Sequence, residues 1–193
     1  RGITAGSGMA TTELRIMLIR IVDRASAAHP SVTPTLFVDD ISAEATGTDR
    51  HVVEHVAGLT NMICQALIAD EMELSDNKCL CTSSSDQLGL PFATELKTYN
   101  IKFCPFVKSL GVGLGAGVRR NAKVAKERLK NFKKKSGRYR KLRRGGVDTA
   151  RILRTGGVAG VTYGAGVSGV SPSMLLSMRR TAATAASPGS GTG

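Results

Sequence analysis

The chain has no tryptophan and few other aromatic residues, with three tyrosines and five phenylalanines among 193 residues. A core built from this sequence must therefore be mostly aliphatic. It also has no uninterrupted apolar run of the ~18 residues that suggests a membrane span, and it shows no internal repeat. Apolar residues nonetheless make up 41% of the sequence. That content is enough for one or two compact units with a core of their own.

Acidic residues are scarce in one segment. Residues 117–154 hold 16 lysines and arginines against 2 acids, whereas the rest of the chain holds 11 against 13, so this segment supplies the whole net charge of +12. Such a segment predicts a polyanionic partner, and we expect nucleic-acid backbone, bound without sequence preference and weakened by salt. An anionic membrane surface is the alternative. Because the apolar stripe of the segment is narrow and rich in alanine, no membrane partner is expected.

Four cysteines occur, at Cys64, Cys79, Cys81 and Cys104. No signal peptide is recognisable, and we expect reduced thiols in an intracellular protein of the nucleus or cytoplasm. A zinc site is the alternative interpretation. The spacing Cys79-x-Cys81 is not that of a zinc finger, which disfavours zinc.

Hydrophobic periodicity predicts several helices. A period of 3.6 residues indicates helices over residues 13–28 and 50–72. Ser85-Asp86 and Ser171-Pro172 are typical helix starts, the second of them with proline at the first helical position. A basic helix after residue 118 is expected to end at Ser136-Gly137.

A further helix is expected between a capping residue and a glycine pair. Asp148 can cap its first turn, and Gly156-Gly157 predicts its end. The glycine-rich segment that follows is expected to lead to the helix that starts at Ser171-Pro172.

Two adjacent acids stand between two short runs of β type. Residues 35–38 and 41–45 predict the strands of a hairpin, with Asp39 and Asp40 at its tight turn. Two carboxylates presented together suit Mg²⁺, which prefers oxygen ligands and takes others from water or from substrate phosphates. An ordinary polar hairpin turn is the alternative.

His51-x-x-Glu54-His55 has the residue order of one class of zinc peptidases. Two imidazoles at i and i+4 share one helix face. No third ligand is evident from the sequence, so a solvated helix face is the favoured interpretation.

The order of the motifs resembles that of the reverse transcriptases of non-LTR retrotransposons, most closely the divergent group seen in dinoflagellate genomes. Residues 2–7 before a helix are similar to the second palm motif of this family, and residues 37–40 (Phe-Val-Asp-Asp) to its catalytic Tyr-x-Asp-Asp box. Residues 75–78 (Ser-Asp-Asn-Lys) are similar to the motif whose lysine lies near the nucleotide triphosphate. Residues 107–112 are similar to the Leu-Gly hairpin that grips the primer. The basic helices and the segment after them are similar to the thumb.

The resemblance implies an α+β fold. Residues 1–116 would form the C-terminal part of a reverse transcriptase palm, an antiparallel sheet with helices and with the Asp39-Asp40 hairpin at its centre. Residues 117–186 would form a basic, helical, thumb-like region. Residues 187–193 would form a disordered tail.

The resemblance also implies an activity, that of an RNA-directed DNA polymerase. Its partners would be an RNA template, a DNA primer and deoxynucleoside triphosphates, and its cofactor two Mg²⁺ ions. Asp39 and Asp40 would hold the metal, and Lys78 would neutralise charge or donate a proton to the leaving pyrophosphate. The other implied site residues are Gly2, Gly6, Ser7 and Phe37 for template and nucleotide, Leu110 and Gly111 for the primer grip, and Arg119, Arg120, Lys123, Lys126, Lys130, Lys133, Lys134, Arg138, Arg140, Lys141, Arg143 and Arg144 for the nucleic-acid backbone.

One part of the family pattern is not in this sequence. The first palm motif, which carries another metal-binding aspartate, would precede Gly2. Two-metal phosphoryl transfer needs carboxylates that bridge both ions, so we expect this chain alone to be inactive, as a C-terminal fragment of the parent enzyme. A non-catalytic basic nucleic-acid-binding module and an inactive retroelement remnant are the alternatives.

Overall fold

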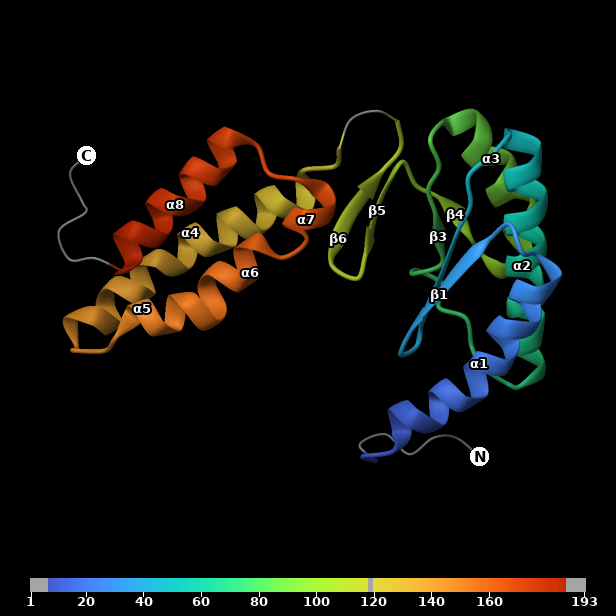
Figure 1. Cartoon of the computed structure of the whole chain (residues 1–193), viewed down its shortest axis with the longest axis horizontal. Coiled ribbons are helices and arrows are strands. Elements are labelled where there is room, and N and C mark those ends of the chain that lie inside the picture. Colours follow the sequence, from blue (N-terminus) through green and yellow to red (C-terminus); the bar gives the residue numbers. More distant parts are fainter. Residues whose placement is uncertain (1–6, 118–119, 187–193) are drawn as a thin grey trace. The chain divides into compact units, whose positions relative to one another are not determined.

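A computed structural model of the chain describes residues 7–117 and 120–186. The chain divides into two compact units, Arg1–Cys104 and Pro105–Gly193 (Figure 1). Both units contain helices and small two-stranded sheets, so the expectation of an α+β fold holds at this coarse level. The division lies ahead of the expected boundary at residue 116, because the hairpin at residues 106–115 packs on helices of the second unit.

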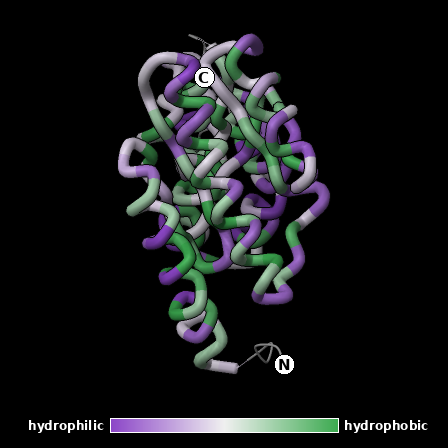
Figure 2. The backbone as a smooth tube through the Cα atoms, turned by 90° about the vertical axis from the view of Figure 1, so that its right-hand side faces the viewer, coloured by the Kyte–Doolittle hydropathy of each residue, from purple (hydrophilic) through white to green (hydrophobic). Residues whose placement is uncertain are grey.

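Two long helices form the core of the first unit. They are α1 (Ala10–Ala28) and α2 (Asp49–Ala69). Leu59, Ile63 and Leu67 recur every four residues on α2 and are buried against α1, where Leu18 and Ala25 are buried in the same cluster. This is the apolar stripe that predicted the two helices from sequence. Figure 2 shows hydrophobic and hydrophilic segments alternating along the helix nearest the N-terminus.

A β-hairpin connects the two helices. Strand β1 (Thr33–Phe37) pairs with strand β2 (Asp40–Glu44) in antiparallel register, and Phe37 lies opposite Asp40. Burial alternates along both strands, with Leu36, Ile41 and Ala43 packed against the core of α1 and α2. The predicted hairpin is therefore present, because its alternating pattern gives it one face to bury. Its turn residues are Val38 and Asp39 rather than the predicted Asp39 and Asp40, since Asp40 pairs with Phe37 as the first residue of β2.

The rest of the first unit is a short βαβ arrangement. Strand β3 (Leu80–Cys81) pairs in parallel with β4 (Lys102–Phe103), and α3 (Asp86–Glu95) and the 3₁₀ turn η1 (Lys97–Tyr99) lie between them. A parallel pair needs such a crossover connection. Ser85 caps α3 as predicted, since its hydroxyl accepts a hydrogen bond from Leu88 N at 3.4 Å.

The expectation of a single antiparallel sheet centred on the Asp hairpin is wrong. The described residues form three separate two-stranded sheets, β1–β2, β3–β4 and β5–β6, and the second of them is parallel. The reason lies in the connections. The chain leaves β1–β2 directly into helices at both ends, so no third strand of the described residues pairs with either outer edge.

The second unit combines one hairpin with a helical bundle. The hairpin is β5 (Phe106–Ser109) with β6 (Val112–Gly115), joined by a two-residue turn. The core of the second unit contains Leu129, Phe132 and Met178 among other buried residues. The helical elements are α4 (Lys123–Arg144), α5 (Thr149–Ile152), the π-helical turn η2 (Leu153–Gly157), α6 (Val158–Thr162), α7 (Ala165–Ser168) and α8 (Pro172–Ala186).

Helix α4 does not end at Ser136-Gly137, as the sequence predicted, but continues to Arg144. The apolar stripe crosses the glycine, because Phe132 is buried and packs on Tyr139 with ring centroids 6.4 Å apart. A glycine inside a helix costs about 1 kcal/mol relative to alanine. Packing of the aromatic pair in the core offsets that cost.

The helix that begins after Asp148 also continues through its predicted end. Asp148 caps it as expected, accepting hydrogen bonds from Ala150 N and Arg151 N. Gly156-Gly157 then falls in a π-helical turn rather than a break. A Cβ at Gly157 would lie 3.1 Å from Phe132 Cε2, so glycine allows the turn to approach the core closely.

One helix of the described residues has the length and mean hydropathy of a membrane-spanning segment, although charged and polar residues interrupt its apolar sequence. It is α2, with a mean hydropathy of 1.3 over its most apolar window. Its apolar side packs against α1 and the hairpin.

Replacing Leu59 with alanine should lower the free energy of unfolding by about 2–5 kcal/mol, because this side chain is fully buried at 0% exposure. Ile68→Ala on the same helix is the matched control. Ile68 is 53% exposed, and its truncation should change the free energy by about 0.5 kcal/mol or less. Urea unfolding followed by circular dichroism measures both, and equal losses would contradict the packing of α2.

Candidate functional site

The tip of the β1–β2 hairpin holds the two candidate metal ligands. Val38 and Asp39 are the two turn residues, and Asp40 is the first residue of β2. Val38 has φ +58°, whereas Asp39 is not among the residues with positive φ. A positive φ at the first turn residue alone is the pattern of a type II′ turn, which favours glycine there. A β-branched residue in this position is strained by about 1–3 kcal/mol.

Both carboxylates of this tip are available to a ligand. Asp39 and Asp40 are exposed, and within the described ranges neither side chain has a hydrogen bond or an ion pair. Asp40 lies on the outer face of the hairpin, opposite Phe37, which is 58% exposed. The tip therefore presents two adjacent acids and an aromatic ring to solvent.

The donor set fits Mg²⁺ in kind but not in number. Carboxylate oxygens are ligands that this ion prefers, and it commonly takes one or two carboxylates together with water and phosphate oxygens. In the part of the chain that the structure describes, no group of three histidines, cysteines or acids is placed to hold a metal. Asp39 and Asp40 would thus supply only part of a coordination shell.

The other predicted residues of the first unit are spread over separate elements. Ser7 is exposed ahead of α1, and its hydroxyl accepts a hydrogen bond from Met9 N at 3.2 Å. Lys78 is exposed in a turn closed by its own N–H, which donates to Ser75 O at 3.4 Å. No hydrogen bond or ion pair joins Lys78 to the acids within residues 7–117. Gly2 and Gly6 lie outside the described residues.

The predicted primer grip is the turn of the β5–β6 hairpin. Leu110 and Gly111 both have positive φ, +45° and +80°. Two positive φ values in a two-residue loop are the pattern of a type I′ turn, whose twist matches that of the strands. Leu110 is 41% exposed. The sequence prediction of a hairpin at this position is confirmed.

Two side chains from distant helical segments hold this turn. Arg128 of α4 donates from Nη2 to Gly111 O at 2.5 Å and from Nη1 to Tyr163 O at 2.7 Å. Tyr163 donates from its hydroxyl to Leu110 O at 3.0 Å. The guanidinium carbon of Arg128 also lies 4.9 Å from the centre of the Tyr163 ring. These contacts attach the hairpin to the helical part of the second unit, a role that sequence reasoning assigned to neither residue.

Helix α4 carries most of the positive charge of the chain. It has twelve lysines and arginines and one glutamate, a net charge of +11 over 22 residues. Ten of the cations are exposed, and within the described ranges none of them pairs with a carboxylate. We call these ten the cationic surface: Lys123, Lys126, Lys130, Lys133, Lys134, Lys135, Arg138, Arg140, Lys141 and Arg144.

Three predicted backbone-binding residues lie outside this surface. Arg120 is exposed ahead of α4. Arg143 is half-buried and donates to Ala185 O at 3.4 Å, where the buried Thr149 hydroxyl also donates at 3.1 Å. A cation at this end of α8 complements the helix dipole, so Arg143 has a structural contact. Arg119 lies outside the described residues.

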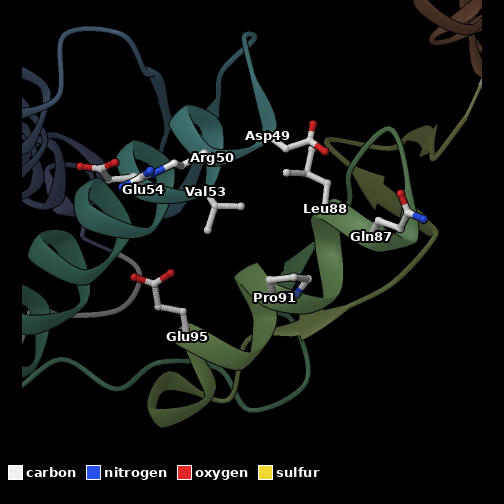
Figure 3. Close-up of a pocket in the computed structure, with 8 residues that line it drawn as sticks. All are labelled: Asp49, Arg50, Val53, Glu54, Gln87, Leu88, Pro91 and Glu95. Carbon is white, nitrogen blue, oxygen red and sulfur yellow. The ribbon is translucent and has the colours of Figure 1, made fainter.

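A shallow groove runs between α2 and α3 and was not predicted from the sequence. Its volume is about 370 Å³, and it includes neither Asp39 nor Lys78. Figure 3 shows its lining side chains from the two helices: Asp49, Arg50, Val53, Glu54, Gln87, Leu88, Pro91 and Glu95. Three carboxylates and one guanidinium at an open groove do not by themselves define a ligand.

The three histidines of the chain come together where α1 ends beside α2. His29 Nδ1 and His55 Nδ1 are 3.3 Å apart, and the rings of His51 and His55 lie with centroids at 4.2 Å. His29 is the third imidazole that the sequence did not reveal. Even so, the described residues contain no three-ligand metal group. A Cβ at Gly58 would lie 2.4 Å from His29 Cε1, which indicates close packing of this ring on α2.

The four cysteines are free thiols in the first unit. Burial raises the pKa of Cys64 from 9.0 to about 11, and the neighbouring Cys79 thiol adds to the increase. Burial likewise raises the pKa of Cys81 to about 11, with a further contribution from Cys104. The raised pKa values keep the Cys64 and Cys81 thiols protonated and unreactive at neutral pH.

Comparison with protein-family models, with curated proteins and with solved structures found no match to this chain. The resemblance to reverse transcriptases therefore depends on the five motifs and their order. The site geometry bears on that resemblance only through the exposed acid pair, the Leu110-Gly111 turn and the cationic surface.

Alkylation of Cys81 by iodoacetamide at pH 8 should be about 100-fold slower in the folded chain than in urea, because the pKa of its thiol is raised from 9.0 to about 11. Only the thiolate reacts, so the difference should shrink as the pH approaches 11. Mass spectrometry of the labelled peptides under reducing conditions measures the rates, with the urea-unfolded chain as the control. Equal rates at pH 8 would contradict the burial of Cys81.

Proposed function

We propose that this chain is part of an RNA-directed DNA polymerase of the non-LTR retrotransposon type, which adds deoxynucleotides to the 3′ end of a primer. The observation that carries the proposal is the tip of the β1–β2 hairpin. Two adjacent carboxylates are exposed there without partners, beside a strained Val38. The order of the other four motifs along the chain supports the same function.

In this proposal the carboxylates of Asp39 and Asp40 would hold Mg²⁺, with water and substrate phosphate oxygens as further ligands. Bound metal ions stabilise the attacking and leaving oxygens of an in-line phosphoryl transfer. The primer 3′-hydroxyl attacks the α-phosphate of the deoxynucleotide, and pyrophosphate leaves. Lys78 neutralises charge on the leaving pyrophosphate or donates a proton to it.

The remaining residues position the substrates. Gly2, Gly6 and Ser7 contact the template and the incoming nucleotide, with Phe37 beside the acids. Small residues before α1 allow the nucleic acid to approach the backbone closely. Leu110 and Gly111 contact the primer. The cationic surface of α4 binds phosphates of the RNA–DNA duplex.

A second candidate function is sequence-independent nucleic-acid binding without catalysis. The observation that favours it is the cationic surface itself, because ten exposed cations on one helix need no acid pair to bind phosphates. The two functions differ in what Asp39 and Asp40 contribute. A pure binding module would keep its affinity and its metal dependence unchanged when these acids are lost.

The metal site can be tested with Mn²⁺ as a paramagnetic probe for Mg²⁺. In the full chain bound to an RNA–DNA duplex and a deoxynucleotide, Mn²⁺ should broaden the amide signals of residues 37–41. The double variant Asp39→Asn, Asp40→Asn should abolish this broadening, since amides are weaker ligands than carboxylates for a hard cation. Asp76→Asn, which removes one exposed acid from a turn, is the control and should leave the broadening in place. Broadening that survives the double variant would exclude the metal site.

The location of nucleic-acid binding can be tested by matched charge removal. Lys126, Lys130, Lys133 and Lys134 changed to glutamine should reduce the slope of log K against log salt by about 3–4, because each phosphate contact contributes about 0.9. The control removes four exposed cations of the first unit, Arg15, Arg20, Lys97 and Lys102. Its slope should match that of the wild type. Equal reductions in both variants would mean that binding is not located on α4.

A further inference from the structure

We propose that Arg128 and Tyr163 are positioning residues that fix the Leu110-Gly111 turn to α4, so that the turn and the cationic surface bind one nucleic-acid backbone as a unit. This inference rests on the proposed function, because it assigns the turn and the surface to the same ligand. It gives Arg128 and Tyr163 a positioning role that neither the motifs nor the charge pattern assigned to them.

The contacts satisfy both carbonyl groups of the turn. Leu110 O accepts a hydrogen bond from the Tyr163 hydroxyl at 3.0 Å, and Gly111 O accepts one from Arg128 Nη2 at 2.5 Å. Carbonyls of a two-residue hairpin turn ordinarily face water. Here the donors come from residues 53 and 17 positions along the chain. The turn is therefore held by tertiary contacts and not by its own strands alone.

Arg128 differs from the cations of the surface on the same helix. It is half-buried, and two of its N–H groups are used by backbone carbonyls. Its guanidinium also lies over the ring of Tyr163 at 4.9 Å, a distance at which a cation–π interaction contributes. Arg128 thus serves the fold of the turn, whereas Lys126 and Lys130, two residues to either side, remain exposed.

Glycines on both sides of the contact permit this approach. A Cβ at Gly111 would lie 2.9 Å from Arg128 Nη2 and 3.2 Å from Tyr163 Cε1. A Cβ at Gly164 would lie 2.9 Å from Val112 Cγ2. Both glycines also have positive φ, +80° and +76°. The close approach therefore depends on glycine at two positions far apart in the sequence.

The held turn presents an apolar side chain and is attached, through Arg128, to the helix that carries the cationic surface. Leu110 is 41% exposed although its carbonyl is bonded. An apolar side chain suits the sugar face of a nucleic acid, while lysines suit its phosphates. Rigid attachment to α4 reduces the entropy lost when both parts bind together.

The variant Tyr163→Phe tests the positioning of the Leu110-Gly111 turn without changing the charge of the chain. It keeps the ring under Arg128 and removes only the hydroxyl that donates to Leu110 O. In the full chain we expect faster hydrogen exchange at the amides of residues 110–112. We also expect about three- to tenfold weaker binding to an RNA–DNA duplex, the size of one net hydrogen bond. The salt slope should stay unchanged, since no charge is lost.

Two further variants complete the test. Arg128→Lys keeps the charge but cannot make the two guanidinium hydrogen bonds, so it should behave as Tyr163→Phe does. Lys130→Gln is the control on the same helix. It should reduce the salt slope by about one and leave the exchange of the turn amides unchanged. Because Tyr163 is 56% exposed, its substitution by phenylalanine should preserve the fold, and the thermal midpoint checks this.

The outcomes distinguish the two proposals. If the wild-type chain does not bind the duplex, the proposed function and this inference both fail. If the wild type binds the duplex and both Tyr163→Phe and Arg128→Lys bind it equally well, the positioning role is overturned, even if the turn amides exchange faster with solvent. The proposed function then stands. A changed salt slope in Tyr163→Phe would also overturn it, since the hydroxyl would then act through charge rather than position.

Discussion

The second unit depends on the balance between charge repulsion and a narrow apolar stripe along α4. A net charge of +11 over 22 residues repels itself, and no described carboxylate pairs with the ten exposed cations. Water and salt screen such charges but do not remove the repulsion. Burial of Leu129 and Phe132 against α8 and the helical segments between holds the helix in place. A polyanion along the exposed side would relieve the repulsion without disturbing that core, which supports the proposed nucleic-acid partner.

The first unit carries a different local cost at the hairpin tip. Val38 adopts φ +58°, and two carboxylates lie next to each other in sequence with no cation of the described residues bonded to them. Neither feature helps the hairpin, whose stability comes from Leu36, Ile41 and Ala43 on its inner face. In most proteins the local conformational preferences of the sequence match the fold, and exceptions are concentrated at functional sites. At the tip of β1–β2 a β-branched residue with positive φ and two unpartnered adjacent acids occur together.

The sequence predicted elements whose signals are local. The alternation of β1 and β2, the four-residue stripe of α2 and the Ser171-Pro172 start of α8 each lie within one element, and each is present. Prediction from the sequence failed where contacts between residues far apart in the chain determine the structure. Phe132 and Tyr139 pack into a core formed with α8 and the segments before it, which carries α4 through Gly137, and no third strand of the described residues joins β1–β2. The same limit applies to the sites. Asp39 and Asp40 were found because they are adjacent, whereas His29 and Tyr163 meet their partners only after 26 and 53 positions of intervening chain.

The acid pair also bears on the choice between catalysis and simple binding. A module that only binds nucleic acid gains nothing from two exposed carboxylates, because they repel phosphates. A metal ion between carboxylate and phosphate oxygens reverses that repulsion, since Mg²⁺ in proteins is commonly held by one or two carboxylates together with substrate phosphates. The strain at Val38 has the same implication, because a glycine there would give the same turn at lower cost. These features of the hairpin tip therefore support the proposed metal-dependent reaction on a phosphate over affinity for the polymer alone.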